Sequence, residues 1–319
     1  MTPEQLHILR FQLPPLGEGA LPSEEFKAYS RFYGIDFTDR VPGLLHLAGH
    51  VPSGDYRLAV QQWRQPAAVA NLLVVHGYFD HIGLFGKLLQ WGLDNRCNVV
   101  ALDLPGHGLS TGEPAVIDDF GDYSCAIRDV LQRVRMPDLP LFVMAQSMGC
   151  ASLIDFAGRY EWPFAAAVLL APLVRPSGWR GIRLAQALIA PFVDSVPRSF
   201  PRNSADEEFL AFVRADPLQC HTVPLRWIRA LRRWLQALQH ADLKVGPALI
   251  VQGDDDGTVD WRYNVPVVEK LFPDSRVHYL AGAGHQLANE SAAYRDDYLA
   301  VVRDYLAGRG ISLRTPDQL

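Results

Sequence analysis

The sequence has few cysteines and little excess charge of either sign. Four cysteines occur among 319 residues, and none of them has C-x-x-C spacing. That pattern argues against a zinc knuckle or a disulfide framework, and it suits a reducing compartment in which cysteines are small buried hydrophobic residues. A formal net charge of -5 provides no basic field, so nucleic acid is not expected as a partner. The cysteines are Cys97, Cys125, Cys150 and Cys220.

The sequence also lacks long uninterrupted apolar segments. No run of about 18 uncharged apolar residues occurs. Residues 1–26 contain early charges and prolines but no continuous apolar region of the kind found in a signal peptide. We therefore expect a cytoplasmic protein. With 49% hydrophobic and 20% charged residues, the chain can form a sizeable globular core.

What the sequence does contain is a regular alternation of strand-like and helix-like segments. Residues 46–64 form two runs around a Pro-Ser-Gly-Asp turn, which predicts an antiparallel hairpin. After it, short Val- and Leu-rich runs are mostly separated by segments of helical period, and this alternation predicts a parallel sheet covered on both faces by helices. The runs are ANLLVVHG (70–77), NVVALDLPGHG (98–108), LPLFVMAQS (139–147), FAAAVLLAP (164–172), GPALIVQGDD (246–255) and SRVHYLAGAG (275–284).

The alternation fails once, over residues 173–245, which have helical patterning and no strand pattern. So long a connection needs structure of its own, and we predict a helical cap at 173–245. The core then comprises 1–172 and 246–319, with the N-terminal arm and first strand in 1–51. One cap segment, 223–240, has an arginine face that would either lie on anionic lipid, giving transient membrane contact, or be a solvated outer face, which we favour. Its apolar stripe is Trp227, Ile228, Leu231, Trp234, Leu235 and Leu238.

Two of the predicted strand ends carry groups suited to acyl transfer, and reactive groups gather at such ends in an open parallel sheet. Gly77 follows a strand, and its freedom would let the N–H of Tyr78 point into a cleft. Ser147 lies at a strand-to-helix turn that would expose its hydroxyl and aim the N–H of Met148 at a substrate carbonyl oxygen. The alternative is a serine that only caps the following helix.

The surroundings of Ser147 depart from the G-x-S-x-G pattern of esterases at one position. Ala145 replaces the first glycine, whereas Gly149 provides the second. One added methyl group is tolerable provided that position 145 does not need backbone angles open only to glycine.

Two later strand ends carry the other groups that an activated serine requires. The segment 251–260, VQGDDDGTVD, offers carboxylates that can orient a histidine, although most of them would be part of a solvated acidic turn. His285 lies on a Gly-rich loop after the last predicted strand. Serine, then aspartate, then histidine is the chain order of the α/β-hydrolase triad. The candidate carboxylates are Asp254, Asp255, Asp256 and Asp260.

From these residues the sequence resembles the α/β-hydrolase superfamily, within the branch of monoacylglycerol lipases, lysophospholipases and serine aminopeptidases. The resemblance covers residues 56–308. It implies an α/β-hydrolase fold: a mostly parallel central sheet flanked by helices, with a helical cap inserted after the sixth strand. The segments that carry it are VVHGYFDHIGLFGKL, VVALDLPGHGLSTGEP, FVMAQSMGC, VQGDDDGTVD, AGAGHQLANE and, in the cap, NSADEEFLAFVRADPL.

The resemblance also implies roles for individual residues. Ser147 matches the nucleophile and His285 the general base. The acid of the family usually stands three residues after a strand-end glycine, which from Gly253 selects Asp256. The oxyanion N–H groups fall on Tyr78 and Met148. Gln146 stands where this branch often has histidine.

The resulting hypothesis is a serine-dependent hydrolase of carboxylic esters or lipids with apolar acyl chains, working through an acyl-enzyme. It needs no cofactor or metal, and the sequence predicts no oligomeric state. Apolar cap residues would form a roof over the acyl chain, or would simply pack the cap onto the core. They are Trp179, Ile182, Leu188, Ile189, Phe192, Trp227 and Trp234.

Three alternatives remain open. An aminopeptidase would need a cap carboxylate, from Glu207, Glu208 or Asp216, to pair with the substrate amine. An epoxide hydrolase or dehalogenase is disfavoured, because those enzymes use aspartate at the position of Ser147. A non-catalytic ligand-binding protein of the same fold is the third.

Overall fold

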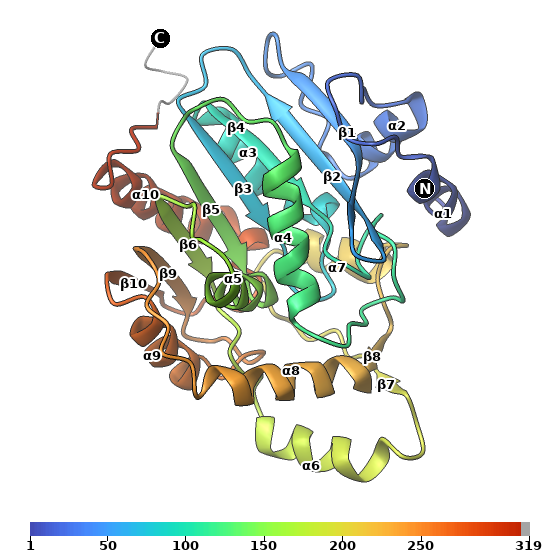
Figure 1. Cartoon of the computed structure of the whole chain (residues 1–319), viewed down its shortest axis with the longest axis vertical. Helices are drawn as coiled ribbons and strands as arrows, with labels where there is room; N and C mark the ends of the chain where they lie inside the picture. The colour runs from blue at the N-terminus through green and yellow to red at the C-terminus, as the bar shows by residue number, and fades with distance from the viewer. Residues whose placement is uncertain (314–319) are drawn as a thin grey trace.

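The central feature of the fold is one twisted sheet with an antiparallel edge and a parallel body (Figure 1). The computed structural model describes residues 1–313. Within them, eight strands lie in the order β1-β2-β4-β3-β5-β6-β9-β10. The hairpin of β1 (Leu45–Ser53) and β2 (Tyr56–Arg64) is antiparallel, as predicted, and β2 pairs antiparallel with β4 (Cys97–Leu102).

All the remaining pairs are parallel, and their strands coincide with the predicted Val- and Leu-rich runs. Because parallel strands all end at the same edge, the loops that follow them meet there. The strands are β3 (Ala70–Val75), β5 (Leu141–Gln146), β6 (Ala166–Leu170), β9 (Ala248–Gly253) and β10 (Ser275–Leu280).

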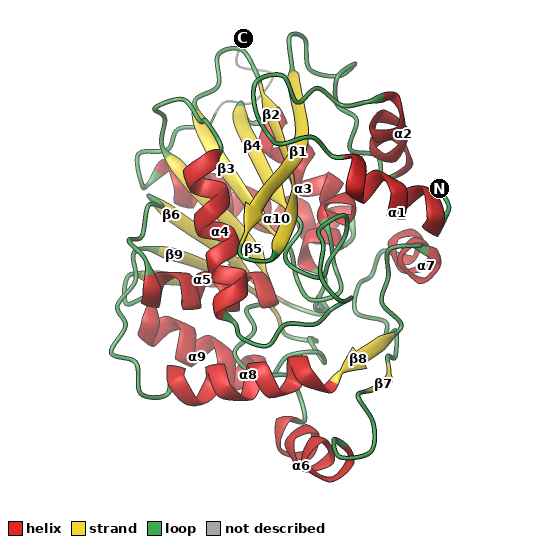
Figure 2. Ribbon diagram, turned by 45° about the vertical axis from the view of Figure 1, so that its right-hand side comes forward, coloured by secondary structure: helices red, strands yellow, loops and turns green. Residues whose placement is uncertain are grey.

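Helices cover both faces of the sheet (Figure 2). In β3, Leu72 and Val74 point into one apolar cluster, and Leu73 and Val75 into the other. Burial on both faces explains why the strands read as continuous apolar runs rather than as alternating patterns. One face carries α3 (Gly86–Asp94), preceded by the short helix η1 (Ile82–Phe85), and α10 (Ala292–Ala307); the other carries α4 (Gly121–Arg133), α5 (Met148–Arg159) and α9 (Trp261–Leu271).

The N-terminal arm forms two helices that the sequence patterns did not predict. Helices α1 (Pro3–Gln12) and α2 (Glu24–Phe32) bury Leu6, Leu9 and Phe26 against the same face as α3. Just after α2, the hydroxyl of Tyr33 donates to Asp216 of the cap at 2.6 Å. The arm therefore packs on the core and also contacts the cap.

The predicted cap segment contains the helices α6 (Trp179–Ile189), α7 (Glu207–Ala215) and α8 (Leu225–Leu238). It also contains a small antiparallel sheet of β7 (Ser195–Pro197) and β8 (Thr222–Pro224), so the expectation of no strands there was wrong. Each strand is three residues long and contains a proline, too short for a detectable alternating pattern. The apolar stripe of α8 is buried as predicted, apart from the half-buried Leu238.

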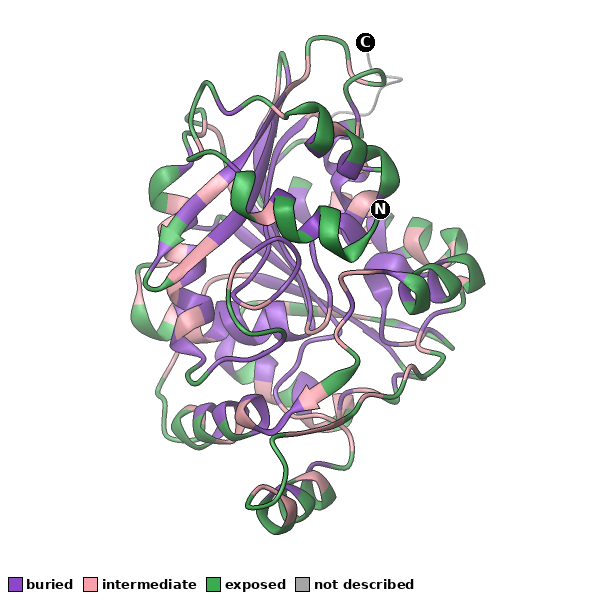
Figure 3. Cartoon of the chain, turned by 90° about the vertical axis from the view of Figure 1, so that its right-hand side faces the viewer, coloured by how far each residue is buried: buried purple, intermediate pink, exposed green. Residues whose placement is uncertain are grey.

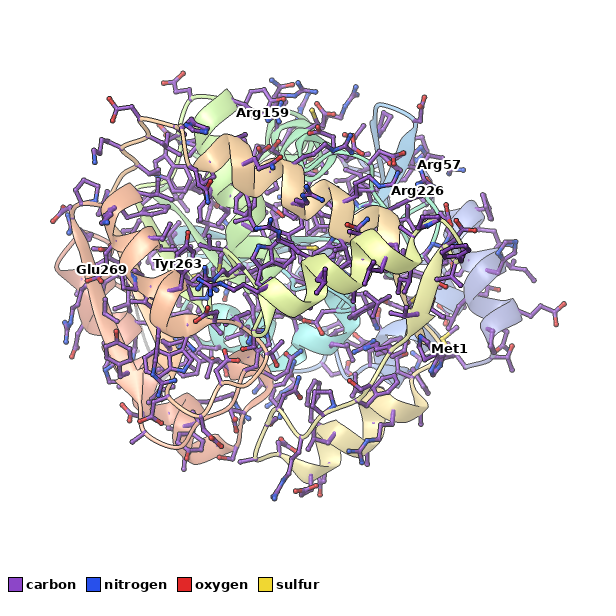
Figure 4. The ribbon with its side chains drawn as sticks, turned by 90° about the horizontal axis from the view of Figure 1, so that it is seen from below. Met1, Arg57, Arg159, Arg226, Tyr263 and Glu269 are labelled. Atoms are coloured by element: carbon purple, nitrogen blue, oxygen red, sulfur yellow. The ribbon has the colours of Figure 1, made fainter. Side chains whose placement is uncertain are left out.

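The arginine face of α8 is not wholly solvated. Arg226, labelled in Figure 4, donates to Glu113 at 2.7 Å and also pairs with Asp118, and Arg233 donates to the Asp118 carbonyl. These acidic residues belong to the loop between β4 and α4 of the core. Part of this face therefore attaches the cap to the core.

Helix α6 lies at the edge of the molecule and is largely exposed (Figure 3), although Trp179 is buried and Ile182 packs against the core. Leu188 is 64% exposed and Phe192 84% exposed, so these two residues do not form the roof expected for them. No helix within residues 1–313 has the length and apolar character needed to cross a bilayer.

The contact between the arm and the cap yields a first prediction. Replacing Tyr33 by phenylalanine deprives the buried carboxylate of Asp216 of one donor, which should lower the free energy of unfolding by about 1–3 kcal/mol in urea denaturation. Tyr294 provides a matched control, because its hydroxyl donates to a carbonyl at an exposed site. Tyr294→Phe should change stability by less than about 0.5 kcal/mol. Equal effects of the two variants would contradict this role of Tyr33.

Candidate active site

Ser147 occupies a strained turn between β5 and α5. Its backbone has φ 52° and ψ -113°, a conformation that residues with a Cβ rarely adopt. The turn is held by the N–H of Ser147, which donates to the Leu170 carbonyl at 2.9 Å, and by that of Leu173, which donates to the Ser147 carbonyl at 3.2 Å. The hydroxyl makes no capping bond to α5, so this serine is not serving as a helix cap.

Ala145 and Gly149, two positions before and after Ser147, meet different steric requirements. Ala145 lies inside β5, paired with Val75 and Leu169, and is not among the residues with positive φ. Its methyl group therefore needs no glycine-only conformation. A Cβ on Gly149, in contrast, would lie 2.6 Å from the Val75 carbonyl oxygen and 2.7 Å from that of His76. Only the second position of the pattern requires glycine here.

The structure brings Ser147, His285 and Asp256 together. His285 Nε2 lies 3.0 Å from Ser147 Oγ, and its Nδ1 lies 2.8 Å from Asp256 Oδ2. All three side chains are buried. The second oxygen of Asp256 accepts the N–H groups of Thr258 and Val259, at 2.8 and 3.1 Å, which holds the carboxylate in place.

The other acidic candidates are directed elsewhere. Asp254 accepts the N–H of Gly282 at 2.6 Å, and Asp260 pairs with Arg175. Asp255 is exposed. Of the four carboxylates that the sequence offered, Asp256 is the one that contacts His285.

Charge and burial act in opposite directions on this pair. Burial lowers the pKa of His285, but the charge of Asp256, its hydrogen bond and the charge of Asp80 outweigh burial and raise the pKa above 6.5. Burial likewise raises the pKa of Asp256, and His285 with the two backbone N–H groups lowers it below its ordinary value. The site thus favours an anionic Asp256 beside a histidine that readily accepts a proton.

The loop after β3 passes directly beside Ser147. A Cβ on Gly77 would lie 3.4 Å from Ser147 Cβ, so the residue just before Tyr78 lies against the serine. The ring of His76 holds the loop: its Nδ1 lies 2.7 Å from the Gly77 carbonyl oxygen, and its Nε2 accepts the N–H of Leu104 at 2.9 Å. Burial lowers its pKa well below 6.5, so His76 is a neutral structural residue.

The aromatic residues of α8 pack on the core. Trp227 stacks on Tyr78, with ring centroids 3.9 Å apart, and Trp234 stacks on Phe120 at 4.9 Å. Tyr78 also donates its hydroxyl to the Ala115 carbonyl at 2.8 Å. Trp227 therefore joins the cap to the loop beside Ser147, and Trp234 joins it to the residue before α4.

Sequence reasoning missed a second buried pair of carboxylate and imidazole. His81 Nε2 lies 2.9 Å from Asp216 Oδ2, and Gln219 donates to the same oxygen at 3.1 Å. Burial raises the pKa of Asp216, but the bonds from His81 and Tyr33 outweigh it and hold the pKa at about 2. The Asp-Pro-Leu that ends the cap segment NSADEEFLAFVRADPL was the available signal, although it did not identify His81 as the partner.

The carboxylates offered for a substrate amine are therefore occupied or remote. Asp216 is enclosed by His81, Tyr33 and Gln219. Glu207 is exposed and pairs with Arg202, and Glu208 is exposed. A buried carboxylate that sequence reasoning did not name, Asp80, lies beside the same loop: one of its oxygens is 2.7 Å from where a Cβ on Gly77 would be.

The cysteines follow the expectation in part. Cys97 and Cys150 are buried, whereas Cys125 and Cys220 are partly exposed, and all four are free. Among residues 1–313, no group of three or more histidine, cysteine, aspartate or glutamate side chains is arranged to hold a metal ion.

With this geometry established, comparison with known proteins identifies the family. The family model described as serine aminopeptidase, S33 matches residues 66–292. The chain belongs to this family. It is an α/β-hydrolase of the monoglyceride lipase and lysophospholipase branch.

Curated relatives cover most of the chain. Phospholipase YtpA of Bacillus subtilis is 27% identical over 262 residues, which are 76% of this chain and 97% of the relative. Monoglyceride lipase of Mus musculus is 28% identical over 286 residues, covering 82% of this chain and 90% of the relative.

Solved structures share the fold at lower identity. A soluble variant of monoglyceride lipase from Saccharomyces cerevisiae superposes with a TM-score of 0.69 at 16% identity, covering 83% of this chain and 97% of that one. The monoacylglycerol lipase of Paleococcus ferrophilus gives 0.67 at 19% identity, with 79% and 99% covered. The predicted α/β-hydrolase fold is confirmed.

The close approach at Gly149 can be tested within a single helix. Gly149→Ala should destabilise the protein by about 1–3 kcal/mol, because the new methyl group meets two carbonyl oxygens. Gly158, also in α5, faces open space, so Gly158→Ala should stabilise by about 0.5–1 kcal/mol. Urea denaturation of both variants measures the difference. A neutral Gly149→Ala would show that the turn is looser than described.

Proposed function

We propose that this protein is a serine hydrolase that cleaves carboxylic esters with apolar acyl chains through an acyl-enzyme. The observation that carries the proposal is the pair of contacts that His285 makes. Its Nε2 lies 3.0 Å from Ser147 Oγ, and its Nδ1 lies 2.8 Å from Asp256 Oδ2. A serine hydroxyl becomes a competent nucleophile when an adjacent base removes its proton, and the base is effective when a third group orients it.

In the proposed mechanism His285 takes the proton of Ser147 as the serine attacks the ester carbonyl. The oxyanion of the tetrahedral intermediate accepts hydrogen bonds from the backbone N–H groups of Tyr78 and Met148. His285 then gives its proton to the leaving alcohol, and the acyl-enzyme forms. Water, deprotonated by the same histidine, releases the acid and restores Ser147. Asp256 holds the imidazole in the required tautomer and stabilises its protonated form throughout.

The names of the relatives support an ester of glycerol as substrate. Phospholipases and monoglyceride lipases act on esters that join an apolar acyl chain to a polar alcohol.

The remaining possibilities are supported less well. A peptidase activity has the family description in its favour, but the cap carboxylates proposed to hold an amine are occupied or exposed. Epoxide hydrolysis and dehalogenation would need aspartate in place of Ser147. Transient membrane contact through the cap is supported by the exposed apolar residues Leu184, Leu188 and Phe192 of the α6 region. The cytoplasmic location stays a prediction.

The nucleophile is tested by substitution. Ser147→Ala should lower kcat on p-nitrophenyl esters by about 10⁴- to 10⁶-fold with an unchanged fold, because no other group can form the acyl-enzyme. A fluorophosphonate probe should label the wild-type protein and not the variant. Rates on p-nitrophenyl esters of graded chain length, monoacylglycerol, lysophospholipid and aminoacyl substrates then rank ester against peptide chemistry. Near-normal turnover in Ser147→Ala would refute the assignment, and absence of labelling in the wild type would favour a non-catalytic protein.

The pH dependence follows from the state of His285. The base acts only when neutral, and its pKa lies above 6.5, so kcat/KM should fall as pH drops through a midpoint above 6.5. Asp256→Asn removes a negative charge that raises this pKa, so the midpoint should move to lower pH while turnover falls by about 10⁴-fold. Profiles of kcat/KM between about pH 5 and pH 9 measure both effects. A wild-type midpoint at or below 6.5 would contradict the described electrostatics.

A further inference from the structure

Two buried glutamines flank the catalytic residues and bond to each other. Gln146 immediately precedes Ser147, and Gln286 immediately follows His285. The side-chain amide of Gln146 donates to Gln286 Oε1 at 2.5 Å. Gln146 is 0% exposed and Gln286 8% exposed. This contact joins the nucleophile turn to the loop of the base, independently of the bond between Ser147 and His285.

The pair belongs to a longer chain of hydrogen bonds in which each group donates to the next. The N–H of Ala288 donates to Gln146 Oε1 at 2.7 Å, and Gln286 Nε2 donates to the two oxygens of Asp80 at 3.2 and 3.4 Å. A backbone donor at one end and a carboxyl acceptor at the other determine how both amides are oriented. Each donor in the chain therefore meets an acceptor.

This chain of hydrogen bonds connects three segments whose relative positions matter for the proposed reaction. Gln146 belongs to the turn of Ser147, Gln286 to the loop of His285, and Asp80 to the loop that carries the N–H of Tyr78. These segments are far apart in sequence: 140 residues separate Gln146 from Gln286, and 206 separate Asp80 from Gln286. Buried amide networks in which every member is satisfied are rigid, because any rotation leaves an unpaired buried group.

Asp80 also contributes charge. It is 3% exposed, and burial raises its pKa, while Arg198, the hydrogen bond from Gln286, His285 and His81 oppose that increase. The charged groups that act on His285 in turn are Asp256 and Asp80. Burial leaves the pKa of Asp80 above its ordinary value, and in its ionised form Asp80 adds a second negative charge beside the histidine that becomes positive during the reaction.

We infer that Gln146, Gln286 and Asp80 are positioning residues for this reaction: the two amides hold Ser147 and His285 at bonding distance, and Asp80 anchors them to the loop of Tyr78 and supports the protonated histidine. The inference rests on the proposed serine hydrolase function. It assigns a role to the glutamine at 146, whose amide donates to Gln286 and accepts from the N–H of Ala288 at once.

The test replaces each amide by a side chain of similar shape that cannot form these bonds. Gln146→Met, Gln286→Met and the double variant should each lower kcat on p-nitrophenyl butyrate by about 10- to 100-fold, with KM changed less than about threefold. Because either substitution interrupts the same chain, the double variant should be no slower than the slower single variant, rather than showing the product of the two effects.

A matched control separates positioning from folding. Gln65 is also buried, and its side chain donates to the Leu93 and Cys97 carbonyls, away from the catalytic loops. Gln65→Met should lose stability in urea denaturation but keep wild-type kcat per folded molecule. If the variants at 146 and 286 behave like this control, the positioning role is refuted.

Asp80→Asn tests the charge separately, because asparagine can still accept the bond from Gln286. The midpoint of the acid limb of kcat/KM should move to lower pH, since protonated His285 loses a neighbouring anion. An unmoved midpoint would overturn the role of Asp80 even if the methionine variants did not fold. Ser147→Ala and fluorophosphonate labelling, run in parallel, distinguish failure of the proposed function from failure of the positioning inference. If the probe does not label the wild-type protein, function and inference are both overturned. If the probe labels it and the methionine variants keep wild-type kcat, the inference alone is overturned.

Discussion

Parallel pairing of the central strands is the constraint on which the site depends. Because β3, β5, β9 and β10 all run in the same direction, the loops that follow them meet at one edge of the sheet. Ser147 and His285 are separated by 138 residues in sequence, yet their side chains are 3.0 Å apart. Reversing β5 or β10 would move its loop to the opposite edge and break the contact between serine and histidine, whereas reversing β9 would remove Asp256 from His285.

Several buried carboxylates lie near this edge, and each has a specific partner. Asp256 is held by backbone N–H groups and His285, and Asp216 by His81 and Tyr33. Asp103, at the end of β4, accepts the N–H groups of Ile82 and Leu109. Burying a charge without such partners is costly, so these bonds order the loops and make the site sensitive to the loss of a single donor. The N-terminal arm and the cap take part through Tyr33 and Asp216.

The two departures from the esterase pattern differ in consequence. Ala145 lies in regular strand conformation and changes little, because the backbone strain is carried by Ser147 itself. Gln146 reaches across to the loop of the base and makes bonds that the pattern gives no reason to expect. A deviation in a motif is therefore informative only when the contacts of the new side chain are known.

The parallel strands, the hairpin, the amphipathic helix α8 and the order of serine, acid and histidine could be predicted from the sequence, because each depends on local periodicity or on residue type at a strand end. Helices α1 and α2, the short strands β7 and β8, and the exposure of Leu188 and Phe192 could not, since they depend on which surfaces meet. The sequence by itself determined the sheet and the residues able to react. The residues alone left four carboxylates open, and the family resemblance selected Asp256. The tertiary structure decided that Asp216 pairs with His81 and that Gln146 joins Gln286. These contacts link positions distant in the chain, and local patterns carry no information about distances between them.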